Sequence, residues 1–164
     1  MKEGLISRIE APRVERREGR ILAGMRGRYS MKTAGEIPAQ WKQFAPYIGK
    51  LEGKVGKAAY GVTAKQIPPD KFDYVSGVEV TDRERIPAPL MSLTLPAQKY
   101  LIFPHRDHLS KLKDTIMAIW GEWLPASNYK VATEEGVPGM VEYYGEDFDP
   151  VTGLGTMELW IPIE

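Results

Sequence analysis

A glutamate set between apolar and aromatic residues is the most chemically suggestive feature of the sequence. Met140, Glu142 and Tyr144 occupy alternate positions of a stretch that is typical of a β-strand, so their side chains share one face. These neighbours favour a carboxylate held away from bulk water, whereas an exposed strand carboxylate is the simpler alternative. A carboxylate among aromatic rings suits a flat or cationic organic molecule, because the rings supply stacking area and the acid supplies orientation.

Other acidic and aromatic residues are candidates for the same site. Glu79 and Glu158 are either site carboxylates, exposed sheet positions or salt-bridge partners of a basic first strand. Tyr60 and Tyr144 either place hydroxyl groups in the pocket or pack against neighbouring strands. Three further large rings either line the cavity or belong to the core: Trp41, Trp123 and Trp160. For Trp120, core packing is the preferred interpretation.

Other chemistries find little support in the sequence. His105 and His108 lie beside Asp107 at a predicted helix start, but the chain has 2 His and no Cys, so loop and cap roles are favoured over a metal site. The acidic stretch 146–149 does not have the ligand spacing of an EF-hand and is better interpreted as a turn. No Ser/His/Asp arrangement stands out. We therefore expect no metal and no cofactor.

The composition narrows the class of protein. The 164 residues carry 22 Lys and Arg against 22 Asp and Glu, and this balance argues against a dedicated nucleic-acid binder. Basic residues gather in 1–28 and acidic residues in 131–164, which we expect to neutralise each other in one sheet rather than to form a basic arm for a polyanion. No apolar run approaches the roughly 20 residues that span a bilayer, and no signal peptide is evident. We expect a cytoplasmic protein without membrane or direct nucleic-acid contacts.

The chain divides into two halves with the same predicted order of strand, helix, strand, strand. The first half covers about residues 13–82, a proline-bearing linker covers about 83–89, and the second half covers about 90–164. Strands are predicted at these positions: 13–29, 57–63, 72–81, 91–103, near 129–132, around 142, and up to 163.

Each half contains one predicted helix. In the first, Trp41, Phe44, Ile48 and Leu51 fall on one helix face, and Pro46 is expected to kink or split the helix. The second helix is predicted over 108–124, with Asp107 as its N-cap and Pro125 ending it. The repeated order predicts an α+β fold of pseudo-duplicated βαββ halves, with antiparallel sheets, helices on one side and a central ligand cleft between the halves.

Short motifs covering most of residues 57–164 support a family resemblance. They are Tyr60-Gly61-Val62, Phe72-Asp73-Tyr74, Gly77-Val78-Glu79-Val80, Leu95-Pro96-Ala97-Gln98-Lys99-Tyr100, Phe103-Pro104-His105, Ile119-Trp120, Trp123-Leu124-Pro125, Val141-Glu142-Tyr143-Tyr144 and Glu158-Leu159-Trp160-Ile161-Pro162-Ile163. In this order they resemble the GyrI-like small-molecule-binding family, the effector-binding domain of some AraC-type and MerR-type regulators. The family often has His-x-Gly before the second helix, whereas this chain has His105-Arg106-Asp107.

The resemblance implies a pseudo-duplicated fold with a pocket in which Glu142 faces lipophilic, often cationic, aromatic ligands. A stand-alone binding protein, acting as an effector sensor or a sequestering protein, is therefore the leading hypothesis. About 13 residues precede the first predicted strand, too few for a helix-turn-helix, so transcriptional regulation would need another protein. One alternative is a hydrolase that opens the cyclopropane ring of DNA-alkylating natural products, with Glu142 activating water and Tyr60 assisting. The other is a DNA gyrase inhibitor acting through the acidic stretch 146–149.

Overall fold

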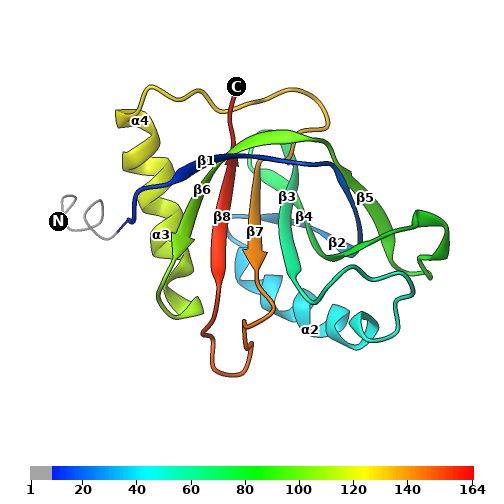
Figure 1. The fold of residues 1–164 in the computed structure, drawn as a ribbon. Helices are drawn as coiled ribbons and strands as arrows, with labels where there is room; N and C mark the ends of the chain where they lie inside the picture. Colours follow the sequence, from blue (N-terminus) through cyan, green and yellow to red (C-terminus); the bar gives the residue numbers. More distant parts are fainter. Residues whose placement is uncertain (1–8) are drawn as a thin grey trace.

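A single curled antiparallel sheet dominates the computed structural model, which describes residues 9–164 (Figure 1). Within this described part, eight strands follow the order β1-β6-β8-β7-β3-β4-β2-β5. The strands are β1 (Arg13–Arg17), β2 (Arg20–Ser30), β3 (Ala59–Ile67), β4 (Lys71–Val80), β5 (Met91–Leu95), β6 (Gln98–His105), β7 (Met140–Tyr144) and β8 (Met157–Pro162). The α+β class predicted from the sequence is confirmed.

Three of the predicted strands differ from the observed ones. The stretch 13–29 is two strands that break before Gly19, and 91–103 is likewise two strands that break at Pro96. A proline offers no N–H to a sheet, which explains the second break. Near 129–132, Val131 forms only an isolated bridge to Ile163.

The two halves of the chain are joined by three hydrogen-bonded strand pairs, which are β1–β6, β2–β5 and β3–β7. β3 pairs with β7, and Gly61 lies opposite Glu142 in this register. The prediction of separate sheets with a cleft between them was therefore wrong, because the two central strands complete each other's backbone hydrogen bonds. Both halves contain two strands, a helix and two strands in that order. An internal duplication of the sequence remains a prediction.

Helix α2 (Ile37–Ile48) packs on one face of the sheet and supplies Phe44, which is 0% exposed, to the core. Pro38 occupies the first turn, where a missing N–H costs nothing. Pro46 lies inside the helix, so of the two expected effects the split does not occur. It lies in the last turn and is exposed, so the helix ends soon after the interrupted hydrogen bond.

The second helical segment combines several kinds of turn. A 3-10 turn (Leu109–Lys111) leads into α3 (Leu112–Ala118), a π-helical turn (Ile119–Trp123) and α4 (Leu124–Ala126). The N-cap is the ring of His108, which accepts from the Ser110 backbone N–H at 3.0 Å, rather than the predicted Asp107. Pro125 was predicted to end the helix after Leu124. It instead lies inside the last turn, and the helix continues to Ala126.

Trp120 is not a core residue, contrary to expectation, since it is 37% exposed. The π-helical turn bonds residues five apart, so the buried side of the helix carries Ile119 and then Leu124. Trp120 is therefore rotated toward solvent. None of the helices among residues 9–164 is long and apolar enough to cross a membrane.

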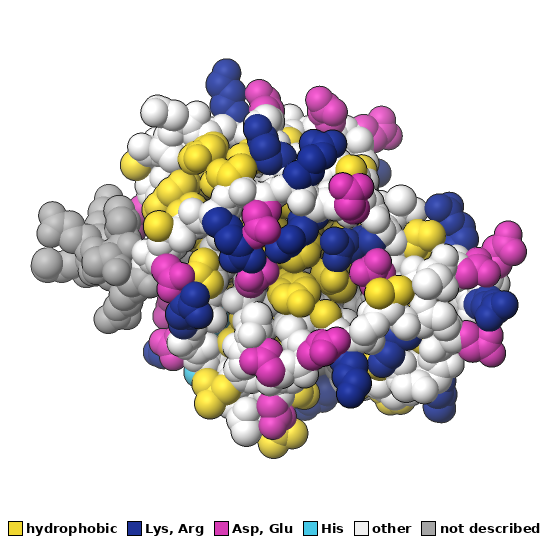
Figure 2. Space-filling view, viewed as in Figure 1, with side chains coloured by type: hydrophobic (Ala, Val, Ile, Leu, Met, Phe, Trp, Pro, Cys, Tyr) yellow, Lys and Arg dark blue, Asp and Glu magenta, His cyan; other side chains and the backbone are white. Residues whose placement is uncertain are grey.

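Successive side chains of a strand point to opposite faces of the sheet. In this sheet both faces carry clusters of apolar side chains. One face packs against α2 and α3, through Phe44 and Ile119 respectively. The other face lies inside the curl and joins side chains from strands, such as Val62, Val75 and Trp160. In Figure 2, hydrophobic side chains gather near the centre of the view among Lys, Arg, Asp and Glu side chains, in the region where Figure 1 shows β7 and β3.

Candidate functional site

Glu142 lies in the middle of the helix-covered face. It is half-buried on β7, opposite Gly61 of β3 on one side and Leu159 of β8 on the other. Strand parity places Met140 and Tyr144 on the same face, as the sequence predicted. Both residues pack with the apolar cluster that lies under α3.

Two phenols and an indole form a chain of hydrogen bonds that ends on Glu142. Tyr74 of β4 and Tyr144 of β7 each donate a hydroxyl proton to Glu142 Oε1 at 2.8 Å. Trp41 of α2 donates its Nε1–H to the Tyr74 hydroxyl at 3.1 Å. These hydrogen bonds connect α2, β4 and β7 through Oε1 and fix the orientation of the Glu142 carboxylate.

Gly61 makes room for this arrangement. A Cβ at position 61 would lie 2.7 Å from Glu142 Oε1 and even closer to the Tyr74 hydroxyl. Both distances are below normal van der Waals contact, so any side chain here would displace the carboxylate or the phenol. The glycine is therefore required by close approach across the sheet face.

The site's electrostatics favour neutral phenols around a carboxyl that resists ionisation. Burial raises the pKa of Glu142, and the hydrogen bonds from Tyr144 and Tyr74 oppose this rise without cancelling it. Burial, followed by the neighbouring Glu142 charge, raises the pKa of Tyr74 and of Tyr144 well above that of a free phenol. Both hydroxyls therefore remain proton donors at neutral pH.

Aromatic rings surround the carboxylate. The Trp41 ring meets the Tyr144 ring edge to face at 5.7 Å and 81°, and Phe148 packs on Tyr144 at 4.9 Å. Trp123 packs with the same apolar cluster, but its ring contacts Phe103 at 5.0 Å on the α3 side. Of the predicted aromatic residues, Tyr144 therefore bonds directly to Glu142, and Trp41 is linked to it through the Tyr74 hydroxyl.

The remaining predicted site residues lie on the opposite face of the sheet. Tyr60 and Trp160 belong to the cluster inside the curl, with ring centroids 6.0 Å apart. Strand alternation places Glu79 of β4 and Glu158 of β8 on that face as well. The sheet backbone separates all four from Glu142, so the pairing of Glu142 with Tyr60 that the hydrolase alternative requires is not present.

Glu79 and Glu158 instead act as partners for arginines of β1 and β2. Arg20 lies 3.6 Å from Glu79 and donates to the Tyr60 hydroxyl at 2.7 Å. Arg13 Nη2 donates to Glu158 at 2.9 Å, and Trp160 Nε1 donates to the same carboxylate at 3.0 Å. Of the roles considered from the sequence, Glu79 and Glu158 therefore have that of salt-bridge partners of the basic strands.

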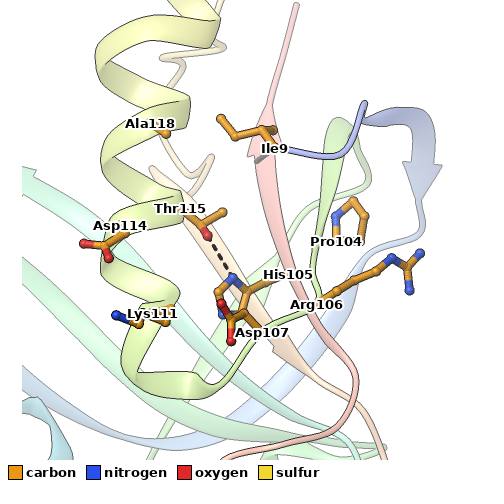
Figure 3. A pocket seen from close by; sticks show the side chains of 9 residues that line it. All are labelled: Ile9, Pro104, His105, Arg106, Asp107, Lys111, Asp114, Thr115 and Ala118. Carbon is orange, nitrogen blue, oxygen red and sulfur yellow. Dashed lines mark hydrogen bonds between the residues drawn. The ribbon is translucent and has the colours of Figure 1, made fainter. Parts of the chain in front are cut away.

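A cavity of about 400 Å³ lies elsewhere, between the start of α3 and the end of β6 (Figure 3). A second, of about 340 Å³, adjoins it and shares four residues with it, Pro104 to Asp107. Glu142 lines neither cavity. The His105 ring is engaged there by Thr115 Oγ1 at 2.8 Å and the His108 carbonyl at 2.9 Å. Among residues 9–164, no three His, Cys, Asp or Glu side chains gather as a metal site requires.

Tyr74 is a residue of the candidate site that the sequence did not single out. Its parity within β4 matches that of Ser76 and Val78, which face α2. β4 follows β3 across the short turn 68–70, but no local signal in the sequence places β3 next to β7, which carries Glu142. Gln40 was missed for the same reason, although it holds α2 to β4 by donating to the Tyr74 carbonyl at 3.2 Å and to Ser76 Oγ at 3.1 Å.

The chain belongs to the GyrI-like family, since the model of the GyrI-like small molecule binding domain matches residues 10–164. This confirms the family resemblance noted in the sequence.

Individual relatives agree with this assignment. The chain is 30% identical over 133 residues to the transcriptional regulator BrlR of Pseudomonas aeruginosa, a match that covers 80% of this chain and 46% of BrlR. The chain thus spans about half the length of this regulator. Its fold is similar to SAV2435 bound to tetraphenylphosphonium, with a TM-score of 0.70, 17% identity and 94% of each chain covered. The EcmrR C-terminal domain has a TM-score of 0.65 at 13% identity, over 95% of this chain and 98% of that domain.

Proposed function

We propose that the chain binds a hydrophobic, cationic aromatic compound at Glu142 and acts as an effector sensor or a sequestering protein. The observation that carries the proposal is the carboxylate itself, half-buried and held by Tyr74 and Tyr144, with Trp41 bonded in turn to the Tyr74 hydroxyl. Among the described residues, no Lys or Arg forms a salt bridge with it. A buried carboxylate without a cation gains most from a ligand that supplies one.

The relatives support this ligand class. SAV2435 has a structure with tetraphenylphosphonium, a hydrophobic aromatic cation, and its fold resembles that of this chain. BrlR is a transcriptional regulator, which supports a role as effector sensor. A ligand ring would lie against Trp41 and Tyr144, where stacking and cation–π attraction act together.

The alternatives drawn from the sequence lack a supporting observation. The hydrolase hypothesis needs a phenol opposite Glu142 across a substrate, but both phenols at the site already donate to the carboxylate. The gyrase-inhibitor hypothesis needs free acidic groups in the stretch 146–149. Glu146 accepts from the Lys57 backbone N–H, and Asp147 accepts from Thr156, so this loop is engaged within the chain.

Calorimetric titration with 1-(dimethylaminomethyl)naphthalene, which is protonated at pH 7, tests the proposal. We expect Glu142→Gln to weaken binding about 30-fold or more, because losing one charge of a buried pair costs about 2 kcal/mol or more. Glu158→Gln is the matched control, since it removes a strand carboxylate from the other face. Equal binding by wild type and Glu142→Gln would overturn the assignment of the site.

A further inference from the structure

We propose that the site selects cations that carry an N–H donor, such as protonated amines and amidines, over cations that carry none. This inference rests on the proposed function and refines its ligand class. It follows from the hydrogen bonds that Glu142 accepts, which leave one of its oxygens free and occupy the groups that donate to it.

The two carboxylate oxygens of Glu142 are not equivalent. Oε1 accepts hydrogen bonds from both Tyr74 and Tyr144. Oε2 accepts none from the described part of the chain. A carboxylate oxygen has room for about two hydrogen bonds, so Oε1 is saturated whereas Oε2 depends on solvent or a ligand.

The donors that reach Glu142, and the indole behind them, are committed within the chain. The Trp41 Nε1–H is used on Tyr74, and both phenol protons are used on Oε1. Behind them, Gln40 Nε2 donates to the Met25 carbonyl, at 2.8 Å, and to groups of β4. None of these groups offers a free donor to a ligand that carries only acceptors, such as a carboxylate or a ketone.

A ligand without any donor would leave Oε2 unsatisfied when it displaces water. An ammonium N–H, in contrast, forms a charge-assisted hydrogen bond to Oε2, which is among the stronger hydrogen bonds in proteins. In quaternary ammonium and phosphonium ions the charged atom bears four carbon groups and no hydrogen. These ions therefore attract the carboxylate electrostatically but cannot donate a hydrogen bond to it. We therefore expect them to bind, but more weakly than protonated amines of the same shape.

A matched pair of ligands tests this selectivity. The protonated tertiary amine 1-(dimethylaminomethyl)naphthalene and the quaternary trimethyl(1-naphthylmethyl)ammonium differ by one methyl group, and both are monocations at pH 7. In calorimetric titrations of the whole chain, we expect the tertiary amine to bind about tenfold more tightly or better, and tenfold corresponds to about 1.4 kcal/mol. In Tyr144→Phe, Oε2 is unchanged, so we expect the preference to persist.

The outcomes separate this inference from the proposed function. If neither cation binds, the proposed function fails. If both bind with Glu142-dependent affinity but equally, or if the quaternary ion binds more tightly, the selectivity inference is overturned and the proposed function stands. A tenfold preference in the wild type that disappears in Glu142→Gln supports the inference, whereas a preference that survives this substitution contradicts it.

Discussion

At the scale of single residues, Glu142 ties ligand binding to the proton. Its carboxyl is buried, which raises its pKa, and the hydrogen bonds from Tyr144 and Tyr74 oppose that rise. A bound cation favours the ionised form, so binding releases any proton that the carboxyl still holds. The burial that prepares the site for a cation therefore also disfavours the ionised form of Glu142 when no ligand is bound.

A pH dependence of stability follows from this raised pKa. The folded state holds the proton more tightly than the unfolded state, so the stabilisation is complete below the unfolded pKa and is lost as pH rises through the folded pKa. We expect the ligand-free wild type to lose thermal stability relative to Glu142→Gln as pH rises from about 4 to 7. Thermal unfolding across this range measures the difference, and parallel curves for the two proteins would contradict it.

Gly61 gives a second prediction at this scale. A methyl group in Gly61→Ala would collide with the Tyr74 hydroxyl and Glu142 Oε1, so we expect a loss of about 1–3 kcal/mol in unfolding free energy together with weaker ligand binding. Urea denaturation and ligand titration measure the two effects. Gly121→Ala is the control, because a Cβ there meets nothing within 4 Å. Unchanged stability in Gly61→Ala would mean that the hydroxyl and carboxylate can move apart freely.

At the scale of secondary-structure elements, helix α2 brings an aromatic wall to a site built on strands. Phe44 anchors it in a cluster with Ala23 and Val78, while Trp41 reaches the Tyr74 hydroxyl from the same helix. The helix pattern in the sequence predicted correctly that Trp41, Phe44 and Ile48 share a face, but α2 ends at Ile48, so Leu51 packs from the segment after the helix. The pattern did not indicate that Trp41 would be half-buried beside the carboxylate while Phe44 would be fully buried.

Loosening this helix should therefore affect both stability and binding. We expect Phe44→Ala to cost about 3–5 kcal/mol of unfolding free energy, the usual range for a buried Phe. Under conditions where the variant remains folded, ligand affinity should fall as well, because Trp41 loses its fixed position. Chemical denaturation and titration test this, with exposed Gln43→Ala as the control. Unaltered affinity in folded Phe44→Ala would separate Trp41 from the site.

At the scale of the whole molecule, the sheet keeps two faces with different tasks. The helix-covered face holds Glu142, and the face inside the curl is stabilised by arginines against aromatic rings. Arg20 lies 5.5 Å from the centroids of both Tyr60 and Trp160, and Arg17 lies 5.1 Å from that of Trp160. Their aliphatic stems cover apolar surface while their charges pair with acidic groups.

The two faces should respond independently to substitution. We expect Arg20→Met to lower the unfolding free energy by about 1–2 kcal/mol, because it removes the hydrogen bond to Tyr60 and the cation–π contacts. The affinity for a cationic ligand should change by less than about twofold, which is well under the tenfold change that 1.4 kcal/mol of binding free energy would produce. Denaturation and titration of the same sample decide this, and a large change in affinity would show coupling across the sheet.

The sequence by itself determined which side chains share a strand face, where the main helices lie and that Glu142 has apolar neighbours. These features depend on local periodicity, which the backbone geometry of strands and helices imposes within a few residues. Only the tertiary structure decided that Tyr74 joins Tyr144 on Glu142, that Tyr60 and Trp160 lie across the sheet, and that the halves share three strand pairs. Pairing between distant strands depends on contacts made throughout the folded chain, so no local pattern contains it.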